Sequence, residues 1–498
     1  MKKLKILVSC VLFVALTLHL LGVAADILTP KFENRYYVLE DYLEDHPEHN
    51  LHDVKIFGSC HAYTSFNPVY MEEVTGVSGF VYANAGEIIP TTYARMVDQF
   101  EKHVPKVALV EIWGMNPYET YSTQEDVFGH YLTNNLERTE FSLAKQEIIL
   151  DFSDKEYESI DLLSMNFPVM NYKDRILDGS LTALDFNYSF EETQPYTATG
   201  TYYEMTTRLK NNGYRATLSH PIENYPQKQN TIAPGEMVEI EPDIVKYIQK
   251  IIELCKSKDV ELIFYRSPYI STVNELKKLN HLKQICDENE VLFIDLEAEI
   301  QYDYKTDFLD YQHLSEIGAN KSTECLLPYI MDALGQTWEK KEIQRENLLV
   351  NSDLTVLDNT NADTWKSRLD KIYAEESGVR VDLGSSEEGW VFYQDVDGMA
   401  DLVGESVTVY LTIADYAGET VKPIISFRDA ENKEIGTAKN GITAGECTVN
   451  GVVPVGTESV RVGIYAWEGG SASDFVTVEN IQLFQGAFTV DTLPVVIN

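Results

Sequence analysis

Hydrophobic residues follow two different spacings along the chain, and the change between them divides the sequence into two parts. In the first part, short apolar runs at 53–59, 79–86, 106–114, 260–268 and 291–297 alternate with helical spacing at 91–105, 243–259, 272–290 and 315–334. Runs that are apolar throughout are typical of parallel strands covered on both faces. We therefore predict an α/β domain over about 51–340, with a three-layer parallel sheet and helices on both faces.

In the second part, the period of the pattern becomes two. Alternating or β-branched runs occupy 389–396, 406–416, 421–429, 447–455, 459–467 and 475–484, separated by glycine, aspartate and asparagine turns. Short strands at this spacing indicate a C-terminal all-β sandwich over 347–498. A charged stretch, QTWEKKEIQREN, precedes it and places the boundary near Glu346.

Between about 118 and 241 the regular pattern is lost. The segment is rich in tyrosine, asparagine, aspartate and threonine, and it is too long for a plain loop. We interpret it as an irregular insertion packed over the sheet, and as a candidate cap.

The N-terminal 26 residues are basic and then apolar, with MKKLK followed by a long apolar run from Ile6 to Ala25. An uncleaved anchor would keep the lysines inside. A cleaved signal peptide would use the small residues Val23 and Ala25 before the cut. The length of the run favours a single-pass membrane anchor, followed by an acidic juxtamembrane segment at 27–50. Both interpretations place the bulk of the protein outside the cytoplasm, anchored at the cell surface or secreted.

Charge and cysteine usage exclude several classes of function. The formal net charge is −39, from 79 acidic and 40 basic residues, which argues against nucleic acid and anionic lipid as partners and is compatible with a glycan. The six cysteines form no CxxC pair and are too few for a disulfide scaffold in 498 residues. We predict no metal and no cofactor.

Polar residues gather at four places expected at the carboxyl ends of strands, where open parallel sheets place their sites. These places are 58–61 (GSCH), 84–86 (NAG), 114–116 (GMN) and 310–313 (DYQH). Asp310 and His313 are spaced so that the carboxylate can orient the imidazole toward a nucleophile. A backbone N–H beside the nucleophile, one near Gly86 and the amide of Asn116 would supply an oxyanion hole.

These four blocks, in this order, resemble those of the SGNH (GDSL-like) hydrolase superfamily. Over roughly 50–335, GSCHAYTSFNP and DYQHLSEIGANKS are similar to the branch of bacterial polysaccharide O-acetyltransferases and the D-alanyl transfer protein of teichoic acid modification. The resemblance implies that Cys60 holds the nucleophile position, with His313 as general base and Asp310 as its partner. It implies an oxyanion hole of Cys60, Gly86 and Asn116, and as partner a multi-pass membrane O-acyltransferase.

The sequence departs from this family at the nucleophile, which is serine in the family and Cys60 here. Cys60 is either a working nucleophile that relays an acyl group as a thioester, or the mark of a site that lost its chemistry and kept binding. A third interpretation gives the chemistry to Ser59. The intact pair of Asp310 and His313 favours retained chemistry.

Three further side chains near the expected site are candidate substrate contacts: Ser59, His61 and Arg266. His61 is more simply explained as shaping the turn through local hydrogen bonds. Arg266, at the end of a predicted strand, is equally well explained by a structural ion pair.

The sandwich resembles carbohydrate-binding modules of the jelly-roll type, on the loose pattern NLLVNSDL…W, GWVFYQDV and VENIQLFQGAF. The resemblance implies that aromatic rings stack on sugars, and the candidates are Trp390, Tyr393, Tyr465 and Trp467. The competing interpretation is that these rings fill the sandwich core.

Two hypotheses follow for the whole chain. The first is an anchored extracellular acyltransferase or esterase that acts on acyl esters, acetyl above all, of a bacterial surface polysaccharide through a covalent acyl-enzyme. The second is a glycan-binding surface protein whose α/β domain has no catalytic activity.

Overall fold

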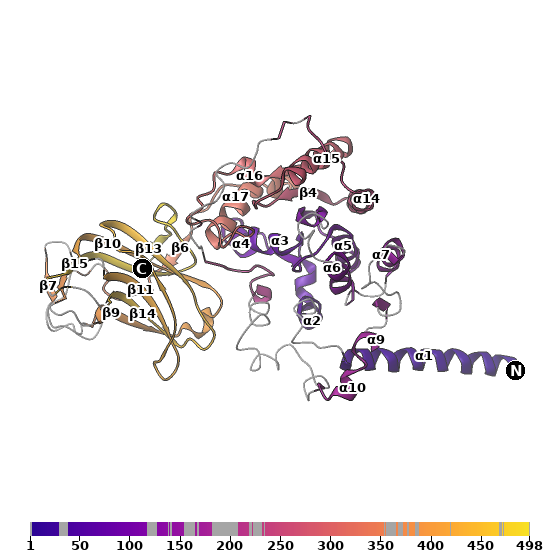
Figure 1. Ribbon diagram of the computed structural model, residues 1–498, viewed down its shortest axis with the longest axis horizontal. Helices are drawn as coiled ribbons and strands as arrows, with labels where there is room; N and C mark the ends of the chain where they lie inside the picture. The colour runs from indigo at the N-terminus through magenta and orange to yellow at the C-terminus, as the bar shows by residue number, and fades with distance from the viewer. Residues whose placement is uncertain are drawn as a thin grey trace.

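Figure 1 shows the computed structural model of the chain, in which an α/β domain and a β-sandwich lie side by side. The structure describes residues 2–28, 38–116, 127–137, 139, 142–153, 165–166, 169–181, 208–218, 222, 232–233, 235–352, 354, 365–366, 372–375, 378–383, 388–418, 420–467, 471 and 473–497.

Five parallel strands form the central sheet of the α/β domain. They are β1 (Val54–Gly58), β2 (Gly79–Ala83), β3 (Val107–Glu111), β4 (Glu261–Arg266) and β5 (Leu292–Asp295), in the order β2-β1-β3-β4-β5. Every residue of β1, β2 and β3 is buried, as their continuous apolar runs predicted. The predicted parallel sheet is confirmed.

Helices cover both faces of this sheet, so the predicted three layers are confirmed (Figure 1). Side chains alternate between the faces along each strand, so that Phe57 packs in one core and Ile56 in the other. One face carries α2 (Val38–Asp45), α5 (Ile89–Lys102), α14 (Pro242–Ser257) and α15 (Val273–Asn289). The other carries α3 (Cys60–Ser65), α4 (Pro68–Thr75), α16 (Leu296–Glu299) and α17 (Glu316–Ala333).

The strand order reverses between β1 and β3. In open α/β sheets a crevice forms outside the carboxyl ends of the two strands that flank such a reversal, and ligands bind there. Here β1 ends at Gly58 and β3 at Glu111, which is followed by the short 3-10 helix η2 (Trp113–Met115). The topology alone therefore predicts a ligand site at the turn that contains Cys60.

Parts of the insertion fall within the described residues: α6 (Val127–Leu136), α7 (Leu143–Ser153), α9 (Val169–Tyr172) and α10 (Arg175–Asp178). Leu132, Ile148 and Phe152 are buried in the core beside α5, so these helices extend that layer. Much of 118–241 lies outside the described residues, and the domain boundaries stay predictions.

The N-terminal helix α1 (Lys2–Leu28) projects from the α/β domain (Figure 1). The short 3-10 helix η1 (Pro47–Leu51) precedes β1 in the chain. No helix in the described part of the chain meets the length and apolarity needed to span a membrane. The juxtamembrane segment falls partly outside the described residues, at 29–37, and the anchor stays a prediction.

The C-terminal part is a sandwich of two antiparallel sheets, which confirms the predicted architecture. One sheet has the order β13-β10-β15-β8-β7 and the other β12-β11-β14-β9. Their bounds are β7 (Ile372–Ala374), β8 (Val379–Asp382), β9 (Gly389–Asp397), β10 (Ser406–Ala417), β11 (Val421–Arg428), β12 (Glu434–Lys439), β13 (Gly445–Val452), β14 (Ser459–Ala466) and β15 (Phe475–Gln485). Two short 3-10 helices, η4 (Met399–Leu402) and η5 (Val490–Thr492), follow β9 and β15 in the chain.

The junction of the two domains is held in several places. Strand β6 (Gln344–Glu346) of the connecting segment pairs in parallel with the C-terminal strand β16 (Val495–Ile497). Glu316, the first residue of α17, accepts a 2.6 Å hydrogen bond from the hydroxyl of Ser406 in the sandwich. Arg345 forms an ion pair with Glu73 of α4. Side-chain and backbone contacts therefore both cross the junction.

Candidate active site

A tight turn at the end of β1 presents Cys60. Gly58 has φ of 138°, and a Cβ built on it would lie 2.9 Å from Cβ of Glu111, so the turn requires glycine there. Ser59 then caps helix α3, with its hydroxyl oxygen accepting a 3.2 Å hydrogen bond from the N–H of His61. Cys60 is consequently the first residue of the helix, half-buried at the mouth of the turn.

The hydroxyl of Ser59 points away from this mouth. It is fully buried and donates a 3.3 Å hydrogen bond to Glu111. Glu111 also accepts hydrogen bonds from the hydroxyl of Ser267, at 2.9 Å, and from the N–H of Trp113, at 3.1 Å. This placement favours a structural role for Ser59 over the predicted substrate contact.

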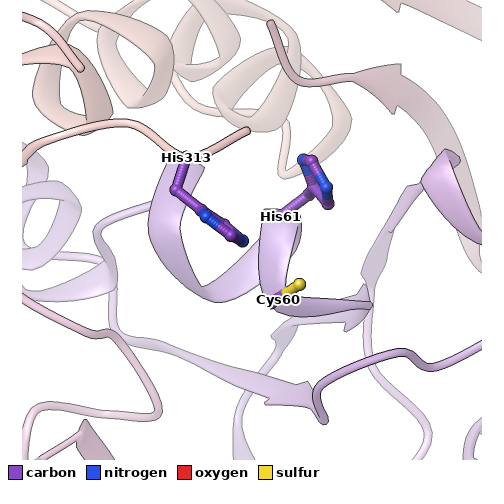
Figure 2. A group of neighbouring side chains, drawn as sticks. All are labelled: Cys60, His61 and His313. Carbon is purple, nitrogen blue, oxygen red and sulfur yellow. The ribbon is translucent and has the colours of Figure 1, made fainter. Parts of the chain in front are cut away.

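Asp310 and His313 face Cys60 from the loop that precedes α17. The carboxylate oxygens of Asp310 lie 3.0 Å from Nδ1 of His313, and one of them also accepts the N–H of His313 at 2.9 Å. These bonds fix the imidazole with its Nε2 edge free for another partner. Figure 2 shows the ring of His313 directed toward the sulfur of Cys60.

The thiol and the imidazole change each other's acidity. Burial raises the pKa of Cys60, but the hydrogen bond to His313, the charge of that ring and a hydrogen bond from the backbone of Gly86 outweigh it and lower the pKa. Burial lowers the pKa of His313, whereas its bonds to Asp310 and Cys60 outweigh this and raise it. Both shifts favour a thiolate beside an imidazolium, the reactive form of a catalytic cysteine.

Two groups of the predicted oxyanion hole lie in this region. The backbone N–H of Gly86, which has φ of 64°, bonds to the thiol of Cys60. Asn116 follows η2 and is almost fully buried, and neither atom of its side-chain amide has a hydrogen-bond partner among the described residues. A buried, unpaired amide is costly unless something else bonds to it, and an oxyanion would do so.

His61 lies inside the same cluster. Its ring stacks on Trp113, with ring centres 5.3 Å apart, and meets Tyr269 edge to face at 5.0 Å. Burial lowers the pKa of His61 well below its usual value, and the nearby charge of His313 acts in the same direction, so the ring is neutral. Its Nδ1 is buried and has no hydrogen-bond partner among the described residues.

Cys60, His61 and His313 are also the side chains best placed here to hold a metal ion. One sulfur and one ring nitrogen from each histidine lie within 4.8 Å of one another. The sequence predicted no metal because no cluster of metal ligands appears along the chain and a metal would be redundant with the pair of Asp310 and His313; His313 is distant from the other two ligands in the chain. The spacing of these three ligand atoms is visible only in the fold.

The charge of Arg266 is near enough to contribute to the lowered pKa of His61, but its guanidinium is engaged in an ion-pair network. Its buried guanidinium is 3.1 Å from Asp295 and 2.6 Å from Glu297, and it donates a 2.9 Å hydrogen bond to Ser271. The arrangement favours the structural ion pair over the predicted contact with a substrate anion.

Two residues of the site were missed from the sequence, Glu111 and Trp113. Glu111 is almost fully buried, and burial raises its pKa to about 7 while hydrogen bonds from Ser267, Trp113 and Ser59 act against this. The sequence did contain a sign of the role of Glu111: it is an acidic residue within the apolar run at 106–114, which is expected to be covered on both faces. Trp113 forms the wall on which His61 stacks.

The four predicted sugar-contact residues lie together on the sandwich. Trp390 is 5.4 Å from Tyr393 and 5.5 Å from Tyr465, and Tyr465 is 4.6 Å from Trp467, measured between ring centres. All four are half-buried, whereas the core holds a different aromatic pair, Trp365 and Phe392. We call this group of Trp390, Tyr393, Tyr465 and Trp467 the aromatic platform.

Three cationic side chains lie close to rings of the aromatic platform. The guanidinium of Arg461 lies 4.2 Å from the ring centre of Tyr393, and the ammonium groups of Lys439 and Lys422 lie 4.6 Å and 5.8 Å from that of Trp467. These distances are within the range of cation–π attraction, which helps to hold the rings in place.

Comparison with known proteins gives partial similarities. No protein-family model matches the chain, and no curated protein matches it. Similar solved structures include a GDSL-like lipase from Bacteroides thetaiotaomicron, with 10% identity and a TM-score of 0.27 over 59% of this chain and 99% of that chain. A xylan-binding domain from Paenibacillus barcinonensis has 11% identity and a TM-score of 0.19 over 30% of this chain and 100% of that chain.

A further similar structure is the enzymatically active domain of tailspike protein 4 from bacteriophage CBA120, with 10% identity and a TM-score of 0.22 over 28% of this chain. The match spans only 21% of that tailspike chain. Similarities of this size identify neither the family nor the activity of the present chain.

Proposed function

We propose that this protein transfers or removes acyl groups, acetyl above all, on a bacterial surface polysaccharide through a thioester on Cys60. The observation that carries the proposal is the chain of contacts from Asp310 through His313 to Cys60. A carboxylate that orients an imidazole, which in turn activates a thiol, is the arrangement needed for nucleophilic acyl transfer.

The reaction would run in two steps. The thiolate of Cys60 attacks the ester carbonyl, and the N–H groups of Cys60 and Gly86 with the amide of Asn116 stabilise the oxyanion. His313 then gives its proton to the departing sugar oxygen, which leaves a thioester on Cys60. In the second step His313 takes a proton from water or from another sugar hydroxyl, and that oxygen displaces the thiolate.

The proposal extends to place and partners. The apolar run at 6–25 would anchor the chain so that both domains lie outside the cytoplasm. A multi-pass membrane O-acyltransferase would then supply the acyl group, as the resemblance to the polysaccharide O-acetyltransferase branch implies. The high negative charge disfavours nucleic acid as a partner.

An activated acyl ester tests the proposal directly. Incubation of the full chain with p-nitrophenyl acetate, followed by mass spectrometry of peptides, is expected to show one acetyl group on the peptide that contains Cys60. Because the pKa of Cys60 is lowered, acetylation is expected to continue at pH values below the ordinary thiol pKa. In the His313→Ala variant the pH dependence is expected to move toward higher pH.

The half-buried Cys325 and Cys447 provide internal controls, because burial raises the pKa of each of these thiols. They are expected to acquire no acetyl group while Cys60 does. Equal acetylation of all three cysteines, or none at Cys60, would remove the support for an acyl-enzyme and favour the alternative of a glycan-binding protein without catalytic activity.

The aromatic platform is proposed to hold the glycan. On an array of bacterial surface oligosaccharides, Trp467→Ala and Trp390→Ala are expected to weaken binding to the best ligand by about 5-fold or more, because tryptophan is enriched among the contacts whose truncation costs over about 1 kcal/mol. The control is Tyr373→Ala, which removes an exposed aromatic ring from β7 in the other sheet. Equal effects of all three changes would exclude the platform as the binding surface.

A further inference from the structure

A sulfur and two imidazoles meet at the mouth of the turn after β1. Figure 2 shows Cys60 and His61, neighbours on α3, beside the ring of His313. Their ligand atoms lie within 4.8 Å of one another. Thiolate and imidazole are the ligands that zinc prefers, and a site with three protein ligands leaves a fourth position open.

The spacing of the two histidine rings fits joint ligation. With Zn–N bonds of about 2.0–2.1 Å and tetrahedral angles, the centres of two coordinating imidazoles lie about 5 Å apart. The ring centres of His61 and His313 are 5.1 Å apart. Tetrahedral ligand atoms are about 3.5 Å from one another, so closing the site requires movements of roughly 1 Å in the Cys60 side chain and the rings.

The surroundings of each histidine support this use. Asp310 holds Nδ1 of His313 at 3.0 Å, which is the carboxylate–histidine arrangement that orients a metal ligand. His61 is 2% exposed, and its Nδ1 has no hydrogen-bond partner among the described residues. A buried ring nitrogen without a hydrogen-bond partner among the described residues has reason to bind a ligand that the fold itself does not supply.

We propose that Cys60, His61 and His313 bind one thiophilic divalent cation of the Zn²⁺ class, and that the bound cation blocks acyl transfer. The two uses exclude each other. The sulfur lone pair that would attack the ester bonds the metal instead, as does the Nε2 atom that would move the proton. Binding releases to solvent the proton that Cys60 and His313 share, and water completes the fourth position.

This inference rests on the proposed function only for its inhibitory consequence, and the metal site itself is testable without activity. Co²⁺ added to the chelator-treated full chain is expected to bind once per chain, with the thiolate-to-cobalt absorption band and the strong visible bands of a four-coordinate site. Cys60→Ser is expected to lose the thiolate band, whereas Cys447→Ser keeps it. His61→Gln is expected to weaken binding by more than about 100-fold, since even the loss of an outer partner costs 10–100-fold.

Adding Zn²⁺ before p-nitrophenyl acetate separates the two proposals. In the presence of chelator, Cys60 is expected to be acetylated. One equivalent of Zn²⁺ is expected to suppress this acetylation, and the suppression is expected to be weaker in His61→Gln. Acetylation without any Co²⁺ band, or a band that persists in Cys60→Ser, overturns the metal site alone. A Co²⁺ band without acetylation in chelator overturns the acyl-enzyme and leaves the metal site standing.

His61→Gln could lose binding by misfolding, because its ring packs on Trp113. Asp310→Asn provides the second variant, since it acts through the orientation of His313 at a half-exposed position. It is expected to weaken Co²⁺ binding by about 10–100-fold while the thiolate band remains at saturation. Unchanged affinity in both variants would overturn the assignment of the two histidines.

Discussion

Acyl-ester turnover is expected to fall by about 10⁴-fold or more in either Cys60→Ala or His313→Ala, because each change removes a group that takes part in bond making. The double variant is expected to be no slower than the slower single variant, since the thiol and the imidazole act as a unit. Initial rates with p-nitrophenyl acetate, with kcat and KM determined separately, provide the measurement.

Two further variants sharpen this test. Cys60→Ser is expected to retain a measurable part of the rate, because His313 can still act as the base for a hydroxyl. Cys447→Ala is the matched control, since it removes a half-buried thiol from β13 of the sandwich and is expected to leave the rate unchanged. Full activity in Cys60→Ala would rule out the thioester and return attention to Ser59 or to a binding role.

The second large effect is expected on stability. Arg266→Met is expected to lower the free energy of unfolding by about 3–5 kcal/mol, because it leaves the carboxylates of Asp295 and Glu297 without their buried cationic partner. The arginine side chain is 3% exposed, so solvent cannot take its place without opening the end of β4. Urea unfolding followed by circular dichroism measures the change.

The control for this change is Lys340→Met, which breaks an ion pair with Glu324 whose lysine is 54% exposed. Its expected cost is about 0–1 kcal/mol. The pair of variants also decides between the two interpretations of Arg266. A substrate contact would raise KM in Arg266→Met and leave stability near that of the wild type, which is the opposite of the result expected here.

The sequence predicted the central sheet well because its strands carry continuous apolar runs, which few other elements share. Short elements were missed: α3 and α4 are six and eight residues long, and they follow strand ends whose polar residues suggested only a loop. Strands β7, β8 and β12 were also missed, because β7 and β8 are only three and four residues long and β12 is largely exposed at a sheet edge.

For the site, the sequence predicted the residues but not their surroundings. The spacing of Asp310 and His313 is local, so the pair could be anticipated, and the structure brings it to Cys60. The stacking of His61 on Trp113 and the burial of Glu111 depend on how β1 and β3 lie together in the sheet. No local pattern in the chain contains that information.

The way the sandwich is attached has a consequence for polymer substrates. Glu316 begins α17 three residues after His313, and its carboxylate is bonded to Ser406, while β16 pairs with the connecting strand β6. The domain that carries the proposed glycan-binding surface and the domain that carries the proposed reacting sulfur are therefore connected by a side-chain hydrogen bond and by strand pairing, in addition to the chain itself. On a repeating polysaccharide, the sugar that reaches Cys60 would then lie a constant number of sugar residues from the sugar bound at the aromatic platform. Acyl groups along the polysaccharide would recur at that spacing.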